Sequence, residues 1–128
     1  MHDRHLTTRT AKISLEKEGY IKISILPGSI IDTEDALDNS LVIKNLSEGK
    51  KMLKLVDARG KWSITSEAKK VSKKNVSPEN TVARAYIIDS FLTKVMFNFF
   101  RFFTRSNTPE DFFNDETEAI DWLLSFKK

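Results

Sequence analysis

VARAYII, residues 82–88, is an almost continuous apolar run that only Arg84 interrupts. Such a run is typical of a strand that is covered on both faces, in the middle of a partly parallel sheet. We therefore expect an interior strand here, with a layered α/β domain built around it. Arg84 is expected either to lie at the rim of the sheet or to pair with an acid.

The residues after this strand predict a helix, an edge strand and a closing helix. The first helix is expected over residues 89–103, where the leading Asp and Ser are suited to cap it. Residues 112–113, two phenylalanines, predict a short edge strand. Asp115 and Glu118 then form a box-like cap for the closing helix. This helix is expected to bury three apolar side chains: Ile120, Leu123 and Leu124.

The residues before the apolar run predict three further strands. Apolar and polar residues alternate over residues 10–16 and again over 21–25, on either side of a turn at residues 18–19 that contains a glycine. This period of two around a short turn predicts a β-hairpin. The apolar residues 52–56 predict the next strand, which ends at Asp57.

Two more helices are predicted between these strands. Residues 32–49 begin with a capping Asp and acids in the first turn, which favour the positive end of a helix. Their apolar stripe is expected to consist of Leu37, Leu41 and Leu46. Residues 65–75 predict a lysine-coated surface helix with Ala68 and Val71 on its inner face.

The predicted order of elements, β-β-α-β-α-β-α-β-α, indicates one α/β domain over residues 10–128. We expect a mixed sheet of four to five strands with about four helices, and a flexible polar tail over residues 1–9. A chain of 128 residues is long enough to bury a core of its own.

Composition excludes several classes of protein. Without cysteines the chain has no disulfides, no thiolate metal site and no cysteine nucleophile, which suits a reducing compartment. No apolar run approaches the roughly 18 residues of a membrane span, and the first residues lack the apolar core of a signal peptide. We therefore expect a cytoplasmic protein. The net charge of +3, and lysines without interleaved aromatics, do not favour nucleic acid.

Catalytic residue sets are not apparent. Both histidines, His2 and His5, fall in the expected tail, so the folded part offers no imidazole as general base or metal ligand. The four glycines are scattered and form no phosphate loop. Acid pairs at helix starts are explained by capping. We predict no enzyme activity, no metal and no cofactor.

One group of polar residues indicates a binding site. Asp57 and Asp89 follow neighbouring strands that we expect to be parallel, and ligands in open α/β sheets gather outside such strand ends. The helix start at residues 65–66 offers free backbone N–H groups to an anion. Alternatively, Asp57 pairs with Arg59 and Asp89 only caps a helix. The remaining polar residues of this region are Arg59, Ser63, Thr65, Ser66 and Ser90.

The helix expected over residues 89–103 carries more apolar surface than one sheet face can cover. Its apolar residues span about 180° of the helix, whereas packing on a sheet needs about 100°. A neighbouring helix, a homodimer interface or a pocket for an apolar ligand would each cover the excess. Phe97 lies alone on the polar side and would mark a partner surface if exposed. The residues concerned are Phe91, Val95, Phe97, Phe99, Phe100 and Phe103.

The stretch from Leu55-Val56-Asp57 to Ala68 resembles a STAS domain, the fold of SpoIIAA-type anti-sigma-factor antagonists. The order of elements extends this resemblance to residues 10–126, and residues 118–123 are similar to the last helix of SpoIIAA-like proteins. The chain also resembles small uncharacterised STAS/SEC14-like bacterial proteins, which carry a similar Val-Asp-Ala-Arg-Gly.

The resemblance implies a regulatory module that binds proteins. In the regulatory family a kinase phosphorylates a serine of an Asp-Ser-Ser-Gly motif at the start of the second helix. Ser66 matches the first serine, Glu67 replaces the acceptor, and the Asp and Gly are missing, which argues against a phospho-switch. The leading hypothesis is therefore a non-enzymatic interaction module, as a homodimer. The alternative, implied by the SEC14-like kinship, is a carrier or sensor of an apolar or anionic ligand.

Overall fold

The computed structural model describes residues 5–75, 81–89 and 108–127. Within these ranges the chain forms a six-stranded mixed sheet with the order β1-β2-β3-β5-β7-β8. The first three strands pair antiparallel, and β3, β5, β7 and β8 pair parallel. Their bounds are β1 His5–Thr7, β2 Ala11–Leu15, β3 Tyr20–Ile25, β5 Met52–Asp57, β7 Thr81–Ile87 and β8 Glu110–Phe113.

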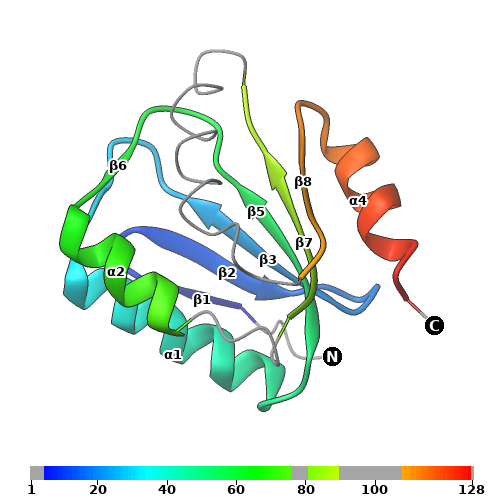
Figure 1. Cartoon of the computed structure of the whole chain (residues 1–128), viewed down its shortest axis with the longest axis horizontal. Helices are drawn as coiled ribbons and strands as arrows, with labels where there is room; N and C mark the ends of the chain where they lie inside the picture. The colour runs from blue at the N-terminus through cyan, green and yellow to red at the C-terminus, as the bar shows by residue number, and fades with distance from the viewer. Residues whose placement is uncertain (1–4, 76–80, 90–107, 128) are drawn as a thin grey trace.

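Three helices and a second, two-stranded sheet complete the described part of the chain. The short strands β4 (Ile30–Ile31) and β6 (Ser63–Ile64) pair parallel beside the main sheet. Figure 1 shows α1 (Thr33–Ser47) and α2 (Ser66–Asn75) together on one side of the main sheet, and α4 (Glu116–Leu124) on the other. The protein is therefore a layered α/β domain with its core on both faces of one sheet.

The predicted interior strand is confirmed. Strand β7 pairs with β5 on one side and β8 on the other, and six of its seven residues are buried, all except Val82. The predicted hairpin is confirmed as β2 and β3, and the strand at residues 52–56 as β5. Strand β8 ends the sheet, as expected for residues 112–113. The helix predicted over residues 89–103 lies outside the described residues.

The number of strands differs from the expected four to five, because β1, β4 and β6 were not predicted. These strands have only two or three residues, too few to show an alternating pattern. Pairing with a neighbour makes them strands: Leu6 of β1 lies opposite Ile13 of β2. Strand β1 also falls within residues 1–9, where we expected a tail, so part of that segment is ordered against the sheet.

Helix α1 begins with the expected cap but buries a different face from the predicted one. Leu46 is buried, whereas Leu37 is 44% exposed and Leu41 is 61% exposed. Leu46 follows Leu37 by nine residues, which at about 100° per residue places it on the opposite side of the helix. The expected stripe was therefore wrong. The inner face instead carries Ala36 and Leu46, with Val42 and Ile43 half-buried.

Asp35 links the start of α1 to the loop before β2. The backbone N–H of Asp32 donates to Asp35 (3.0 Å), and the Asp35 N–H donates to Asp32 (2.9 Å), which forms a capping box. Arg9 donates from Nε to Asp35 Oδ1 (2.9 Å) and from Nη2 to Oδ2. Hydrogen bonding from Arg9 lowers the pKa of Asp35 below its ordinary value of 3.8, although burial opposes this.

Replacing Asp35 by Asn should make the domain less stable at neutral pH and less sensitive to acid. A carboxylate with a lowered folded pKa stabilises the fold above its unfolded pKa, and this stabilisation disappears as pH falls through the folded value. The difference in urea midpoint between wild type and Asp35→Asn should therefore be full at about pH 7 and shrink below about pH 4. The exposed Asp38 on the same helix supplies the control, Asp38→Asn. A difference that does not change with pH would contradict the argument.

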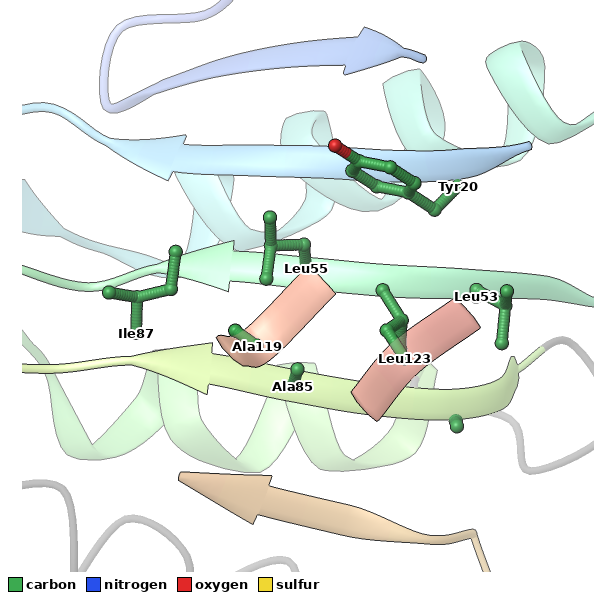
Figure 2. Close-up of a cluster of buried hydrophobic side chains, with 8 residues drawn as sticks. Tyr20, Leu53, Leu55, Ala85, Ile87, Ala119 and Leu123 are labelled. Atoms are coloured by element: carbon green, nitrogen blue, oxygen red, sulfur yellow. The ribbon is translucent and has the colours of Figure 1, made fainter. Parts of the chain in front are cut away.

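The largest core cluster lies between the sheet and α4. Leu53 and Leu55 of β5 face Ala119 and Leu123 of α4, with Ala85 beside them (Figure 2). The cap of α4 is confirmed, since Asp115 accepts from the Glu118 N–H (2.9 Å). Of the three side chains expected to be buried, Leu123 is fully buried, while Ile120 and Leu124 pack against the cluster and are half-buried.

Candidate functional site

The candidate site lies where the parallel strands β5 and β7 end. Asp57 is the last residue of β5 and pairs in register with Ile87, two residues before Asp89. The N–H of Ala58, which is fully buried, donates to the Ile87 carbonyl (2.9 Å) and extends the ladder by one residue. The two strands are thus parallel neighbours, as expected, and both aspartates lie at one edge of the sheet.

Asp57 forms a two-point pair with Arg59. The guanidinium donates from Nε to Oδ1 (2.9 Å) and from Nη2 to Oδ2 (2.7 Å), and the Arg59 backbone N–H also donates to Oδ1 (3.2 Å). Burial raises the pKa of Asp57, but the hydrogen bonds from Arg59 outweigh it, so the pKa is lowered overall. The pairing weighed from the sequence is confirmed, and it holds Asp57 ionised.

Lys22 and Glu116 extend this pair into a row of four charges. Arg59 Nη2 also reaches Glu116 Oε1 (3.4 Å), and Lys22 Nζ donates to Glu116 Oε2 (3.0 Å). The row joins β3, the end of β5 and the first turn of α4, and its side chains are all partly exposed. The sequence did not predict that Lys22 and Glu116 belong to this site. The local pattern around Lys22 indicates only the polar face of a strand, and that around Glu116 only the start of a helix.

Asp89 holds the loop that follows β5. Its Oδ2 accepts from the Gly60 N–H (3.1 Å), and its other oxygen, Oδ1, is buried without a hydrogen-bond partner among the described residues. Gly60 has a φ of +92°, which a residue with a side chain rarely adopts. The glycine therefore allows the backbone turn that aims this N–H at Asp89.

Trp62 fixes the middle of the same loop. Its indole Nε1 donates to the Ala58 carbonyl (2.9 Å), and its ring packs both on the cluster around Tyr86 and on the cluster beneath α2. Backbone bonds also run from Gly28 N to Lys61 O (2.7 Å). The loop is held at several points, so the charged row presents a preformed surface.

The residues at the start of α2 form a separate group. Thr65 accepts from the Ala68 N–H (3.1 Å) and is the cap of this helix, while Ser63, Ser66 and Glu67 are exposed. Figure 1 places β6 and the start of α2 at the opposite side of the molecule from α4. The Thr65 side chain occupies one free N–H and Glu67 adds negative charge, and both disfavour a bound anion at this helix start.

The apolar half of the predicted site cannot be placed. Ser90 and the aromatic helix residues, Phe91, Val95, Phe97, Phe99, Phe100 and Phe103, lie outside the described residues. Whether they cover a partner or a ligand stays a prediction.

A second polar group, which sequence reasoning largely missed, is buried on the face of the sheet opposite α4. Arg84 of β7 pairs with Glu110 of β8, and the exposed fractions of their side chains are 6% and 4%. Tyr86 donates its hydroxyl to the same carboxylate (3.2 Å). Arg84 was expected either to lie at the rim of the sheet or to pair with an acid. The structure confirms the pairing. Lys54 of β5 lies directly beside Arg84 in register.

Among the residues that the structure describes, no three His, Asp or Glu side chains are grouped so that they could hold a metal ion. None of the described helices is both long and apolar enough to cross a membrane.

Comparison with known proteins identifies the family and the fold. The profile of a family described as "Domain of unknown function (DUF7793)" matches residues 13–127. Among solved structures, the chain is similar to an uncharacterized protein of the DUF3478 family from Shewanella loihica PV-4, which has a SpoIIAA-like fold. The TM-score is 0.68 at 17% identity, over 96% of this chain and 98% of that one. The predicted SpoIIAA-like fold is confirmed. No match was found among curated proteins.

Proposed function

The chain belongs to the DUF7793 family, and we propose that it is a non-enzymatic regulatory module that binds another protein. The observation that carries the proposal is the row of paired charges formed by Lys22, Asp57, Arg59 and Glu116 on a rigid loop at the edge of the sheet. Partly exposed ion pairs contribute little to the free energy of folding. A row of such pairs on a loop fixed by hydrogen bonds is instead suited to binding a partner protein of complementary charge.

The same residues do not support catalysis. Asp57 and Glu116 are each engaged by a cation, and the described part of the site offers no histidine and no activated nucleophile. A serine switch is also not part of the proposal. Ser66 is exposed, but Glu67 beside it already places a negative charge at the start of α2, where a phosphate would act.

Reversing the charge of Arg59 tests the proposal. The tagged full chain and its Arg59→Glu variant are used to recover partners from host extract, and the affinity for the recovered protein is then measured. Arg59→Glu should weaken binding by about tenfold or more, since like charges opposed at an interface cost several kcal/mol. Its unfolding free energy should change by about 1 kcal/mol or less, because the pair is partly exposed.

Lys12→Glu is the matched control, because Lys12 is an exposed lysine of β2 outside the charged row. It makes the same change in charge and should leave the affinity unchanged. Equal loss in both variants, or no effect of Arg59→Glu, would refute the assignment of this surface. Light scattering on the full chain tests the homodimer expected from the phenylalanine-rich helix.

A second candidate function is a carrier or sensor of a small amphiphilic ligand. It was expected from the aromatic helix, but one described residue favours it independently. Lys54 is buried with no acid paired to it among the described residues.

A further inference from the structure

The outer side of α1, which faces away from the sheet, carries a stripe of exposed residues. At about 100° per residue, the stripe spans an arc of about 80° and lies opposite the buried Leu46. Spacings of three and four residues alternate along it, as in the seam of a coiled coil. Figure 1 shows α1 along one edge of the molecule, with α2 beside it. The stripe consists of Glu34, Leu37, Leu41 and Lys44.

Two leucines occupy the middle of this stripe. Leu37 and Leu41 lie about one turn apart, and both are exposed. A single exposed leucine is common on protein surfaces, but two side by side form an apolar patch. The core does not need them, because other residues form the face of α1 that packs on the sheet. The pair is therefore suited to contact another apolar surface.

Opposite charges flank the two leucines. Glu34 precedes Leu37 by three residues, and Lys44 follows Leu41 by three. Both charged side chains are exposed, and neither forms an ion pair with another described residue. They lie about 15 Å apart along the helix axis, too far to pair with each other. An acid in the first turn and a lysine in the last also suit the helix dipole, but that role does not require them on the side of the leucines.

The stripe is complementary to a second copy of itself. In an antiparallel pair of α1 helices about a two-fold axis, Leu37 of one copy faces Leu41 of the other. The same alignment puts Glu34 opposite Lys44, and each contact occurs twice. A shift of one turn that brings Leu41 onto its own copy would set Glu34 against Glu48, a like charge. A shift in the other direction leaves both charges unpaired, so the sequence favours one alignment.

We propose that two copies of the chain associate through α1, in an antiparallel pair with these leucines at its centre. The interface lies on the face of the sheet opposite α4 and does not use the charged row at Arg59. Each copy contributes one helix, and interfaces below about 1,200 Å² are typical of weak complexes. We therefore expect a Kd on the order of 100 μM, with mostly monomer at the few micromolar of a denaturation experiment.

Sedimentation equilibrium of the full chain, from about 10 μM to about 1 mM, tests the proposal. The average mass of wild type should rise from that of the monomer toward that of the dimer. Leu41→Ala should raise the Kd about tenfold or more, because the symmetric interface loses the leucine contact twice. In dilute solution this variant should unfold as wild type does, since the side chain is exposed.

Charge reversal tests the alignment of the two helices. Glu34→Lys and Lys44→Glu each bring like charges together twice, so either variant alone should raise the Kd about tenfold or more. In an equimolar mixture of the two variants both pairs again have opposite charge, and dimers should form with about the wild-type affinity. Restored association also shows that both variants are folded. Lys12→Glu, at an exposed lysine of β2, is the control and should associate as wild type does.

Three results would each overturn the proposal: a wild type that stays monomeric at about 1 mM, a dimer that Leu41→Ala does not weaken, or a mixture of the two charge variants that associates no better than either alone. A dimer formed through the phenylalanine-rich helix would give the second result. Arg59→Glu should dimerise as wild type does, which keeps this interface distinguishable from the partner-binding surface.

Discussion

Glu110→Ala is expected to lower the free energy of unfolding by about 3–5 kcal/mol, the usual effect of removing one partner of a buried ion pair. The variant leaves Arg84 buried and unpaired, and it also removes the acceptor of the Tyr86 hydroxyl. Lys54 lies beside Arg84, so two uncompensated cations would share one low-dielectric region. Burial raises the pKa of the Tyr86 hydroxyl, so tyrosinate cannot replace the lost carboxylate at neutral pH.

The double variant Arg84→Met with Glu110→Leu removes both charges and leaves no unpaired charge buried. It therefore distinguishes the cost of an unpaired Arg84 from the contribution of the ion pair itself. Replacing both charges by apolar side chains of similar size is often neutral or stabilising by about 1–4 kcal/mol, so most of the loss should be recovered. Asp111→Ala, at the exposed neighbour on β8, should change the free energy by about 0.5 kcal/mol or less. Urea denaturation followed by circular dichroism measures all three. A loss below about 1 kcal/mol in Glu110→Ala would show that Arg84 reaches water.

The main sheet was predictable because its strands carry strong local patterns. The run at residues 82–88 and the alternation in β2 and β3 each determine a strand without knowledge of its neighbours. Arg84 was correctly expected to need an acid, but Glu110 is 26 residues away, and only the register of β7 on β8 brings them together. The strands that were missed exist only through such pairing.

The candidate site was also predictable only where local sequence patterns determine the position of a residue. Parallel strands end at one edge, so Asp57 and Asp89 could be placed together from their positions after two apolar runs. Lys22 and Glu116 could not, since 94 residues separate them and their contact depends on where the first turn of α4 lies on the sheet. The start of α2 was expected at the same edge, but β6 pairs with β4 and leads the chain to the other side.

Leu123→Ala should destabilise the domain by about 2–5 kcal/mol, the range for deleting a buried leucine side chain. Leu123 is fully buried, and it inserts from α4 between the side chains of β5 and β7 (Figure 2). Its neighbours there include Ala83, Ala85 and Ala119, which are too small to fill the space that the leucine would leave. A cavity should therefore remain, which places the expected loss in the upper part of the range.

Leu41→Ala is the matched control, because it deletes the same atoms from a leucine that is 61% exposed on α1. Its effect should stay within about 0.5 kcal/mol, as for other surface substitutions. The comparison also separates folding from recognition, because α4 supplies Glu116 to the charged row. If Leu123 only anchors α4, Leu123→Ala should weaken partner binding in proportion to the unfolded fraction, and excess ligand or lower temperature should restore it. A loss of binding in a chain that remains fully folded would instead mean that the position of α4 itself controls the Arg59 surface.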